Sequence, residues 1–225
     1  MSPRLGILGG TFDPIHHGHL VAAQEALYQL RLDRMLFVPA GDPPHKPSRP
    51  VSPAPHRVRM VELGTAGQTD FVVSRVDVDR PGPHYTVDTL QSLHQAWGPE
   101  ACLYFIEGSD SLADILSWYR PERLIELAEL AVVERPGVKL DLDELERRLP
   151  GLRERIHWVR MSSLEISSTD LRARVREGRP ISYLLPAAVE AYVREHGLYR
   201  WVGVPVRGRR SCLSCQTGTP PSGFK

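Results

Sequence analysis

Short apolar runs alternate with segments of helical periodicity along most of the chain. The apolar runs, several of them β-branched, predict strands at residues 4–9, 35–39, 71–78, 102–107, 130–133 and 156–159. Apolar residues at three- and four-residue spacing predict a first helix around Leu20, Ala23, Leu27 and Leu30, and later helices at residues 57–63, 86–97, 121–130, 141–149, 169–177 and 187–195. Strands separated by helical crossovers predict a doubly wound, Rossmann-like α/β fold, with a parallel sheet covered by helices on both faces.

Two segments break this alternation. Residues 40–55 are rich in proline and predict an irregular loop, which in a compact domain is a lid, a binding loop or a disordered stretch. Beyond Arg200 the chain is rich in Gly, Pro, Ser and Arg and poor in large apolar residues, which predicts a disordered tail. We therefore expect one domain over residues 1–200 and a tail over residues 201–225. The tail's Cys212 and Cys215 lack the second pair that a closed zinc site needs, so we interpret them as incidental.

Composition narrows the class of protein. The chain has 225 residues, of which 41% are hydrophobic and 24% charged, the balance of a soluble globular protein. A formal charge of +1 gives no global field toward nucleic acid or membrane. Three cysteines are too few for a disulfide framework, and the apolar stretch from Leu5 to Leu8 is too short for a signal peptide or membrane span. We expect a reduced, cytoplasmic protein, and the sequence does not determine its oligomeric state.

The most informative segment follows the first predicted strand and opens the first predicted helix. It runs from Gly9 to His19 with the sequence GGTFDPIHHGH. Glycines permit close approach of the backbone to a ligand, and the helix that follows presents free N–H groups. This arrangement predicts an anion site, most naturally for phosphate. The segment is neither a dinucleotide fingerprint nor a P-loop, so it favours neither hydride transfer nor P-loop hydrolysis.

Three histidines lie within this segment, and more than one role fits them. On a helix His16 and His19 share a face while His17 points away. The pair could donate hydrogen bonds to a phosphoryl group, most strongly when protonated. A metal site would need a third nearby ligand, and a histidine near a helix start is often only a surface group or a cap. We favour phosphate contact and keep the other two roles open.

A second helix start has a similar character. In the segment from Ile166 to Arg172, Ser168 is a suitable N-cap and Thr169 and Asp170 suit a first turn. Arg172 lies one turn further along, where its guanidinium can reach an anion at the helix start. A capped surface helix would have the same sequence. Two helix starts suited to phosphate fit a ligand that carries a triphosphate.

The first segment also resembles the signature of the nucleotidyltransferase superfamily, whose core is His-x-Gly-His. Over residues 4–199 the chain is similar, within that superfamily, to the bacterial nicotinate-nucleotide adenylyltransferases. The further matching motifs are PPHK at residues 43–46, YTVDTL at residues 85–90, with His84 in place of the usual serine, and the segment from Ser167 to Arg172. The core motif alone would not separate these enzymes from pantetheine-phosphate adenylyltransferases or cytidylyltransferases.

The resemblance implies roles for individual residues. The catalytic residues it implies are His16, His19 and Arg172. For nicotinate mononucleotide it implies Lys46, Thr86, Trp118 and Tyr119, although a tryptophan at that spacing is more often core packing. For ATP it implies Gly9, Gly10, Thr11, Phe12, Gly18, Gly108, Asp110, Arg135, Ile166, Ser168 and Thr169, and Asp110 could equally be an N-cap.

The implied activity is transfer of the adenylyl group of ATP to nicotinate mononucleotide, which releases pyrophosphate. It implies Mg²⁺, which we expect on ATP oxygens because the sequence shows no carboxylate cage, and we predict no protein metal site. Nicotinamide mononucleotide or phosphopantetheine remain alternative acceptors. A catalytically silent nucleotide-binding module, or a metalloprotein built on the histidines and cysteines, are alternatives of another class.

Overall fold

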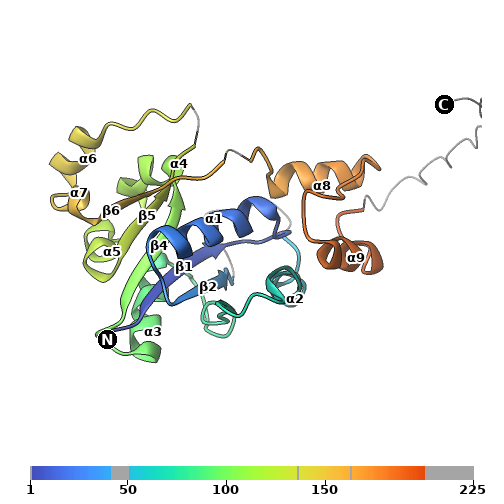
Figure 1. The fold of residues 1–225 in the computed structure, drawn as a ribbon, viewed down its shortest axis with the longest axis horizontal. Coiled ribbons are helices and arrows are strands. Elements are labelled where there is room, and N and C mark those ends of the chain that lie inside the picture. The colour runs from blue at the N-terminus through green and yellow to red at the C-terminus, as the bar shows by residue number, and fades with distance from the viewer. Residues whose placement is uncertain (1, 42–50, 136, 163, 201–225) are drawn as a thin grey trace, which may run out of the picture.

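The protein folds around one parallel sheet (Figure 1). The computed structural model describes residues 2–41, 51–135, 137–162 and 164–200. Lys46 and the expected tail, with Cys212 and Cys215, lie outside the described residues. Within them, six strands pair in the order β3-β2-β1-β4-β5-β6. Their bounds are β1 (Arg4–Gly10), β2 (Arg34–Pro39), β3 (Phe71–Val73), β4 (Cys102–Gly108), β5 (Glu129–Val133) and β6 (Ile156–Val159). The predicted doubly wound fold is confirmed.

The strand order reverses between β1 and β4, the place where an open α/β sheet forms a crevice. The chain passes outward from β1 through β2 to β3, then returns to the other side of β1 with β4 and continues to β6. In open α/β sheets, ligands bind beyond the carboxyl ends of the strands at such a reversal. The ends of β1 and β4 therefore mark where a ligand is expected.

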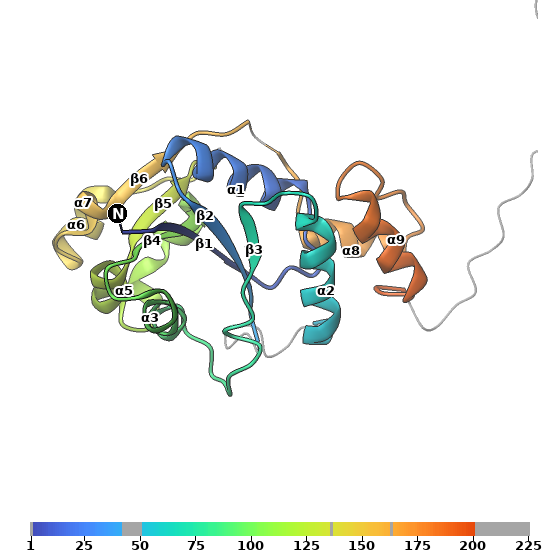
Figure 2. The ribbon, with the colours of Figure 1, turned by 60° about the horizontal axis from the view of Figure 1, so that its bottom comes forward.

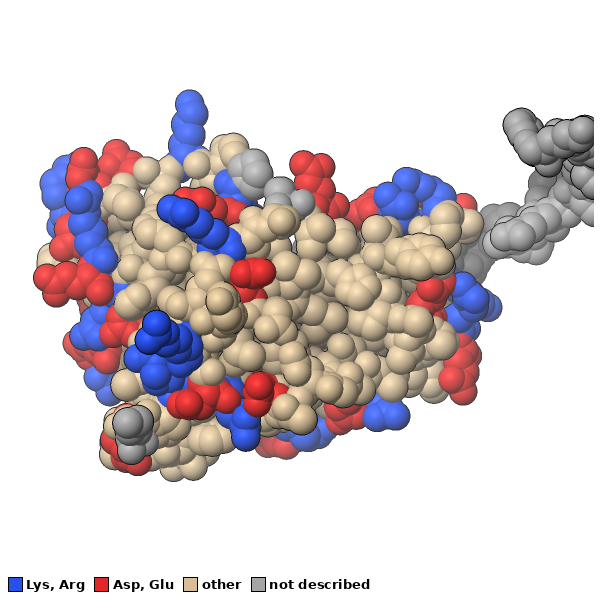
Figure 3. All heavy atoms as spheres, in the orientation of Figure 1, with Lys and Arg blue, Asp and Glu red and all other residues tan. Residues whose placement is uncertain are grey.

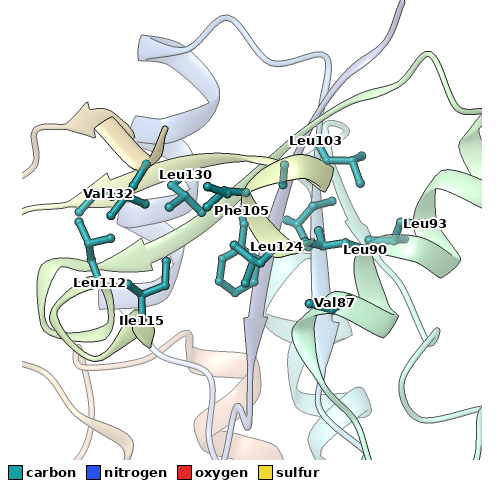
Figure 4. Packing of buried hydrophobic residues seen from close by; sticks show 14 of the residues in the cluster. Val87, Leu90, Leu93, Leu103, Phe105, Leu112, Ile115, Leu124, Leu130 and Val132 are labelled. Carbon is teal, nitrogen blue, oxygen red and sulfur yellow. The ribbon is translucent and has the colours of Figure 1, made fainter. Parts of the chain in front are cut away.

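Helices cover both faces because alternate strand residues point to opposite sides. Leu103, Phe105 and Val132 pack on one face of the sheet (Figure 4). This face is covered by α3 (Thr86–Trp97), α4 (Ser109–Ala113), the 3-10 turn η1 (Ile115–Ser117), α5 (Pro121–Leu127), α6 (Leu142–Arg148) and α7 (Leu152–Arg155). Tyr104 and Ile106 pack on the other face, which is covered by α1 (His17–Gln29), α2 (Ala54–Thr65), α8 (Ser168–Arg176) and α9 (Ala187–Glu195). Figure 2 shows α2, α8 and α9 gathered near the end of β1 that leads into α1.

Several predicted boundaries were wrong. The strand predicted at residues 71–78 stops at Val73, because the chain then turns and Asp79 N–H donates to the carbonyl of Arg75. The helix predicted at 121–130 ends at Leu127, since β5 needs Leu130 for its ladder with β4. The helix predicted at residues 57–63 begins earlier, at Ala54, within the stretch expected to be irregular. A helix was predicted after Gly108, where α4 lies, but the short elements η1 and α7 had no sequence prediction.

The surface carries charges of both signs. On the face drawn in Figure 3, acidic and basic side chains are interspersed around areas of other residues. No helix in the described part of the chain is long and apolar enough to cross a bilayer.

Candidate active site

The segment after β1 is closely packed where its glycines lie. A Cβ on Gly10 would lie 3.1 Å from the ring of Phe12, and a Cβ on Gly18 would lie 3.0 Å from Nδ1 of His16. The same position at Gly18 lies 3.7 Å from the carbonyl oxygen of Ile166, far along the chain. A side chain at residue 18 would therefore press on the imidazole of His16, while its contact with the distant Ile166 would be an ordinary one.

His16 and His19 form a stacked pair at the start of α1. His16 is the N-cap residue, and the two ring centroids lie 3.7 Å apart with 28° between the ring planes. The backbone N–H of His16 donates to Nδ1 of His19 at 3.2 Å. Because an N–H group can only donate, Nδ1 of His19 is the acceptor nitrogen, and the proton of the neutral ring is on Nε2. Nδ1 of His16 is buried and has no hydrogen-bond partner among the described residues.

Both imidazoles are uncharged at neutral pH in the free protein. Burial, with smaller contributions from the charges of Arg135 and His17, lowers the pKa of His16 to about 4. Burial, then His16 and Arg135, lower the pKa of His19 well below its usual value. The free protein therefore does not carry the pair in the protonated form that would donate most strongly. His19 can still donate from its neutral Nε2–H.

The first turn of α8 contacts the segment after β1 directly. The hydroxyl of Ser168 donates to the carbonyl of Pro14 at 2.8 Å, and Nη1 of Arg172 donates to the carbonyl of Asp13 at 2.7 Å. Nη2 of Arg172 lies 3.3 Å from the hydroxyl of Thr169. The two segments suited to phosphate therefore meet, although they are more than 150 residues apart in sequence.

The N-cap of α8 differs from the prediction. Ser167, not Ser168, is the N-cap, and its hydroxyl accepts the N–H of Asp170 at 3.1 Å. The bond to Pro14 explains the difference, because it uses the Ser168 hydroxyl outside the helix.

A third wall comes from the end of β4. Asp110 pairs with Arg135, with Nε–Oδ1 and Nη1–Oδ2 distances of 3.3 Å, and the backbone N–H of Arg135 donates to the hydroxyl of Ser109 at 3.0 Å. A Cβ on Gly108 would collide with both Asp110 and Arg135. Gly108, not Asp110, is the N-cap of α4. The charge of Arg135 contributes to the lowered pKa of both His16 and His19, which indicates that Arg135 lies near the two imidazoles.

Aromatic side chains form a wall beside β1. Trp118 meets Phe105 edge to face, with ring centroids 5.8 Å apart, and a Cβ on Gly9 would lie 3.6 Å from the Phe105 ring. Tyr119, next in the chain, stacks on Tyr85 with 4.3 Å between centroids. Tyr85 is the N-cap of α3, which begins at Thr86. The structure thus groups Thr86, Trp118 and Tyr119, and Trp118 also packs against the core.

Two buried charged side chains, Arg57 and Asp13, support the segment after β1, and the sequence did not predict them. Arg57, 2% exposed, donates to the carbonyls of Thr11 at 3.0 Å, Ala40 at 2.6 Å, Gly41 at 2.9 Å and Ser52 at 2.9 Å. The carboxylate of Asp13, also 2% exposed, accepts the hydroxyl of Tyr199 at 2.7 Å and the N–H of Ser52 at 3.2 Å. An arginine in a helix gives no sequence signal of such burial.

Glu107 at the end of β4 was also not predicted. Its side chain is 6% exposed, and neither carboxyl oxygen has a hydrogen-bond partner among the described residues. Burial, with a smaller contribution from Asp110, raises its pKa to about 8. The carboxyl group is therefore protonated at neutral pH.

The groups around the crevice fit an anion. They are the imidazoles of His16 and His19 and the guanidinium groups of Arg172 and Arg135, the latter paired with Asp110. Among the described residues, no cluster of three His, Cys, Asp or Glu side chains could hold a metal ion.

Comparisons with known proteins agree with the fold and show the family. The cytidylyltransferase-like family matches residues 7–174. The chain is 49% identical over 199 residues to a protein of Thermomicrobium roseum named "Probable nicotinate-nucleotide adenylyltransferase", covering 88% of this chain and 92% of that protein. A protein of Roseiflexus sp. with the same name is 50% identical, and the match covers 88% of this chain and 99% of that protein.

Solved structures share the fold at lower sequence identity. Nicotinic acid mononucleotide adenylyltransferase of Plasmodium falciparum, complexed with NaAD, matches with a TM-score of 0.70 and 20% identity, covering 88% of this chain and 97% of that chain. The same protein complexed with APC matches with a TM-score of 0.69.

Proposed function

The chain belongs to the nicotinate-nucleotide adenylyltransferase family of the cytidylyltransferase-like proteins, and from this premise we propose that it transfers the adenylyl group of ATP to nicotinate mononucleotide. The products are deamido-NAD and pyrophosphate, so the reaction belongs to NAD biosynthesis. We assign the activity to residues 1–200, because the family match and the relatives fall largely within them.

The observation that carries this proposal is the convergence of two segments on one crevice. Ser168 and Arg172 of α8 bond to the carbonyls of Pro14 and Asp13, immediately before the His16–His19 pair. The two imidazoles, the guanidinium of Arg172 and the start of α8 are thereby brought close together. Such a set of donors suits a triphosphate, whose charge is spread over several oxygens.

The chemistry needs positioning and charge stabilisation more than a base. An oxygen of the 5′-phosphate of nicotinate mononucleotide attacks the α-phosphorus of ATP and forms a new P–O bond. The bond from the α-phosphorus to the bridging oxygen breaks, and pyrophosphate leaves with the electron pair. The attacking phosphate is already anionic, so no covalent enzyme intermediate is required. Catalysis then depends on aligning the two phosphates and stabilising negative charge as it shifts.

Each wall of the crevice has a proposed task. His16 and His19 donate to the phosphates of ATP, and Arg172 with the α8 start at Ser168 and Thr169 holds the part that leaves as pyrophosphate. The segment from Gly9 to Gly18 forms the phosphate loop. Its shape is set by Gly9, Gly10, Thr11, Phe12 and Gly18. Gly108, Asp110, Arg135 and Ile166 bind the rest of ATP.

The acceptor lies against the aromatic wall in this proposal. Trp118 offers its ring to the pyridine ring, Tyr119 borders the same wall with its ring edge, and Thr86 offers its hydroxyl. Lys46, outside the described residues, is proposed for the phosphate of the mononucleotide.

Mg²⁺ fits this site only as part of the nucleotide. The donors are cationic or N–H groups, and both carboxylate oxygens of the buried Asp13 already accept hydrogen bonds. These residues do not fit a divalent cation held by the protein. Mg²⁺ carried by ATP oxygens would neutralise part of the phosphate charge.

A panel of acceptors tests the proposal. Pyrophosphate release is measured with ATP and each of nicotinate mononucleotide, nicotinamide mononucleotide and phosphopantetheine. We expect the highest kcat/KM with nicotinate mononucleotide. Faster release with phosphopantetheine would assign a different acceptor, and ATP binding without release from any acceptor would make the protein a nucleotide-binding module.

A further inference from the structure

Arg120 has an unusual backbone conformation beside the aromatic wall. Its φ and ψ angles are 52° and 61°, in the left-handed region, and it immediately precedes Pro121. For a residue with a Cβ this region is unfavourable, and a following proline further restricts the backbone. Non-glycine residues keep such a conformation only when their surroundings hold them in it, and they cluster at ligand-binding sites.

An aromatic stack holds the side chain of Arg120. Its guanidinium carbon lies 5.0 Å from the ring centroid of Tyr119, a cation–π contact, and Tyr119 itself stacks on Tyr85. The two helix starts that carry these residues, α5 and α3, are thereby joined. The guanidinium is fixed in place on the exposed side of the stack.

This guanidinium has no acidic partner among the described residues. No ion pair or hydrogen bond to a described residue involves it, whereas Arg123, three residues further along α5, pairs with Glu126 at 2.7 Å. Twelve other arginines in the described ranges form ion pairs, whereas the charge of Arg120 is met there only by the Tyr119 ring. A cation that is anchored by stacking and keeps its N–H groups free is suited to an external anion.

Arg120 ends a continuous line of contacts that begins at the phosphate loop. Gly9 lies against Phe105, and Phe105, which Figure 4 labels in the core beneath α5, meets Trp118 edge to face. Tyr119 follows Trp118 in the chain and lies under the guanidinium of Arg120. A ligand with a phosphate near Gly9 and a flat ring along this wall would present its far substituent toward Arg120.

We propose that Arg120 is a specificity-determining residue that selects an acceptor bearing a carboxylate on its pyridine ring over one bearing a carboxamide. This inference rests on the proposed function and adds the residue that sets the preference between the two acceptors. A carboxylate offers two acceptor oxygens and a negative charge to the guanidinium fork. A carboxamide is neutral, and its NH₂ group would face N–H donors. Selection therefore arises from charge and from donor–acceptor matching.

The test compares two acceptors on matched variants. Arg120→Asn removes the cation but tolerates the left-handed backbone, and Arg120→Lys keeps a charge without the planar fork. We expect Arg120→Asn to lower kcat/KM for nicotinate mononucleotide by roughly 10- to 100-fold, the range of a charge-assisted hydrogen bond. The kcat/KM for nicotinamide mononucleotide should change less than about threefold. For nicotinate mononucleotide, Arg120→Lys should have a kcat/KM between those of the wild type and Arg120→Asn. Arg123→Asn, on the same helix, is the control and should match the wild type with both acceptors.

The outcomes separate this inference from the proposed function. An equal fall of kcat/KM with both acceptors would make Arg120 a structural residue and overturn the inference. No change of kcat/KM with either acceptor would also overturn it. No pyrophosphate release by the wild type with either acceptor would instead overturn the proposed function. Thermal melting of each variant checks the fold, and if Arg120→Asn fails to fold, the ratio measured on Arg120→Lys decides.

Discussion

The two ring nitrogens of His19 have different tasks. Nδ1 accepts the N–H of His16 and so fixes the ring orientation, while the proton is left on Nε2. Burial keeps the ring neutral, so this proton is available as a donor without any charge on the imidazole. The motif predicted a phosphate donor at this position, but only the packing shows which nitrogen can donate.

Two substitutions can separate these tasks. His19→Asn places an oxygen near the Nδ1 position and keeps the acceptor, but it removes the Nε2–H donor. His19→Gln places an N–H group near Nε2 and loses the acceptor. We expect His19→Asn to lower kcat by roughly 100- to 1,000-fold, as for the loss of one donor to a transition-state oxygen, and His19→Gln to retain more activity. Steady-state pyrophosphate release measures both, and near-normal kcat in His19→Asn would contradict the role.

Glu107 predicts a pH dependence of stability. Its folded pKa of about 8 is above the ordinary value of 4.5, so the unfolded state loses its proton first as the pH rises. The wild type should therefore lose stability between about pH 4.5 and pH 8, by at most about 4 to 5 kcal/mol, with no further loss above that range. Glu107→Gln should lack this loss. Urea unfolding at several pH values measures it, with the exposed Glu122→Gln as control, and parallel pH profiles for wild type and Glu107→Gln would refute the prediction.

At the scale of elements, α8 is positioned by two adjacent serines with separate partners. Ser167 caps the helix through the N–H of Asp170, and Ser168 attaches it to the carbonyl of Pro14. The sequence predicted a capped helix at this place but assigned the cap to Ser168. Adjacent hydroxyls are equivalent in sequence, and only the approach of the segment after β1 distinguishes them.

Substitution of Ser167 and of Ser168 should affect different properties, stability in the first case and nucleotide binding in the second. Ser167→Ala removes the cap and should lower the free energy of unfolding by about 1 kcal/mol. Ser168→Ala should leave the helix capped but raise the KM for ATP several-fold more than Ser167→Ala does. Melting curves and ATP titrations of both variants measure the contrast. If Ser168→Ala leaves the KM for ATP unchanged, the attachment of α8 does not contribute to nucleotide binding.

At the scale of the whole molecule, the last described turn of the chain supports its first loop. The hydroxyl of Tyr199 donates to Oδ1 of the buried Asp13, 186 positions away in the sequence. Burial and the neighbouring Asp13 raise the pKa of Tyr199, so the hydroxyl stays protonated as a donor. The carbonyl of Asp13 in turn accepts Arg172, so one residue links the phosphate loop to both C-terminal segments.

Removal of this hydroxyl should affect stability and activity together. Tyr199→Phe leaves a buried carboxylate oxygen without its donor, which should cost about 1–3 kcal/mol of unfolding free energy. It should also lower kcat/KM, because the segment that carries His16 loses a support. Tyr183→Phe is the matched control, since Tyr183 is 93% exposed. Equal melting temperatures for the two variants would show that the contact contributes nothing.

Much of the fold followed from local pattern. The strands at Cys102 and Ile156 and the helices at Thr86 and Ala187 were predicted within one residue, because each has a clear period and clear end signals. The strand after Phe71 was predicted too long, because β-branched residues continue past Val73 while pairing with β2 stops there. Strand length depends on the partner strand, which local sequence does not contain.

The sequence by itself determined the order of elements, the doubly wound class and which residue types could meet phosphate at Gly9 to His19 and at Ser168 to Arg172. Only the tertiary structure decided that His16 and His19 are neutral, that Arg57 and Asp13 are buried supports, and that Arg120 is held over Tyr119. The physical reason is that periodicity and turn residues act over a few positions. Desolvation, ion pairing and ring stacking depend on groups that are distant in the chain and become neighbours only on folding.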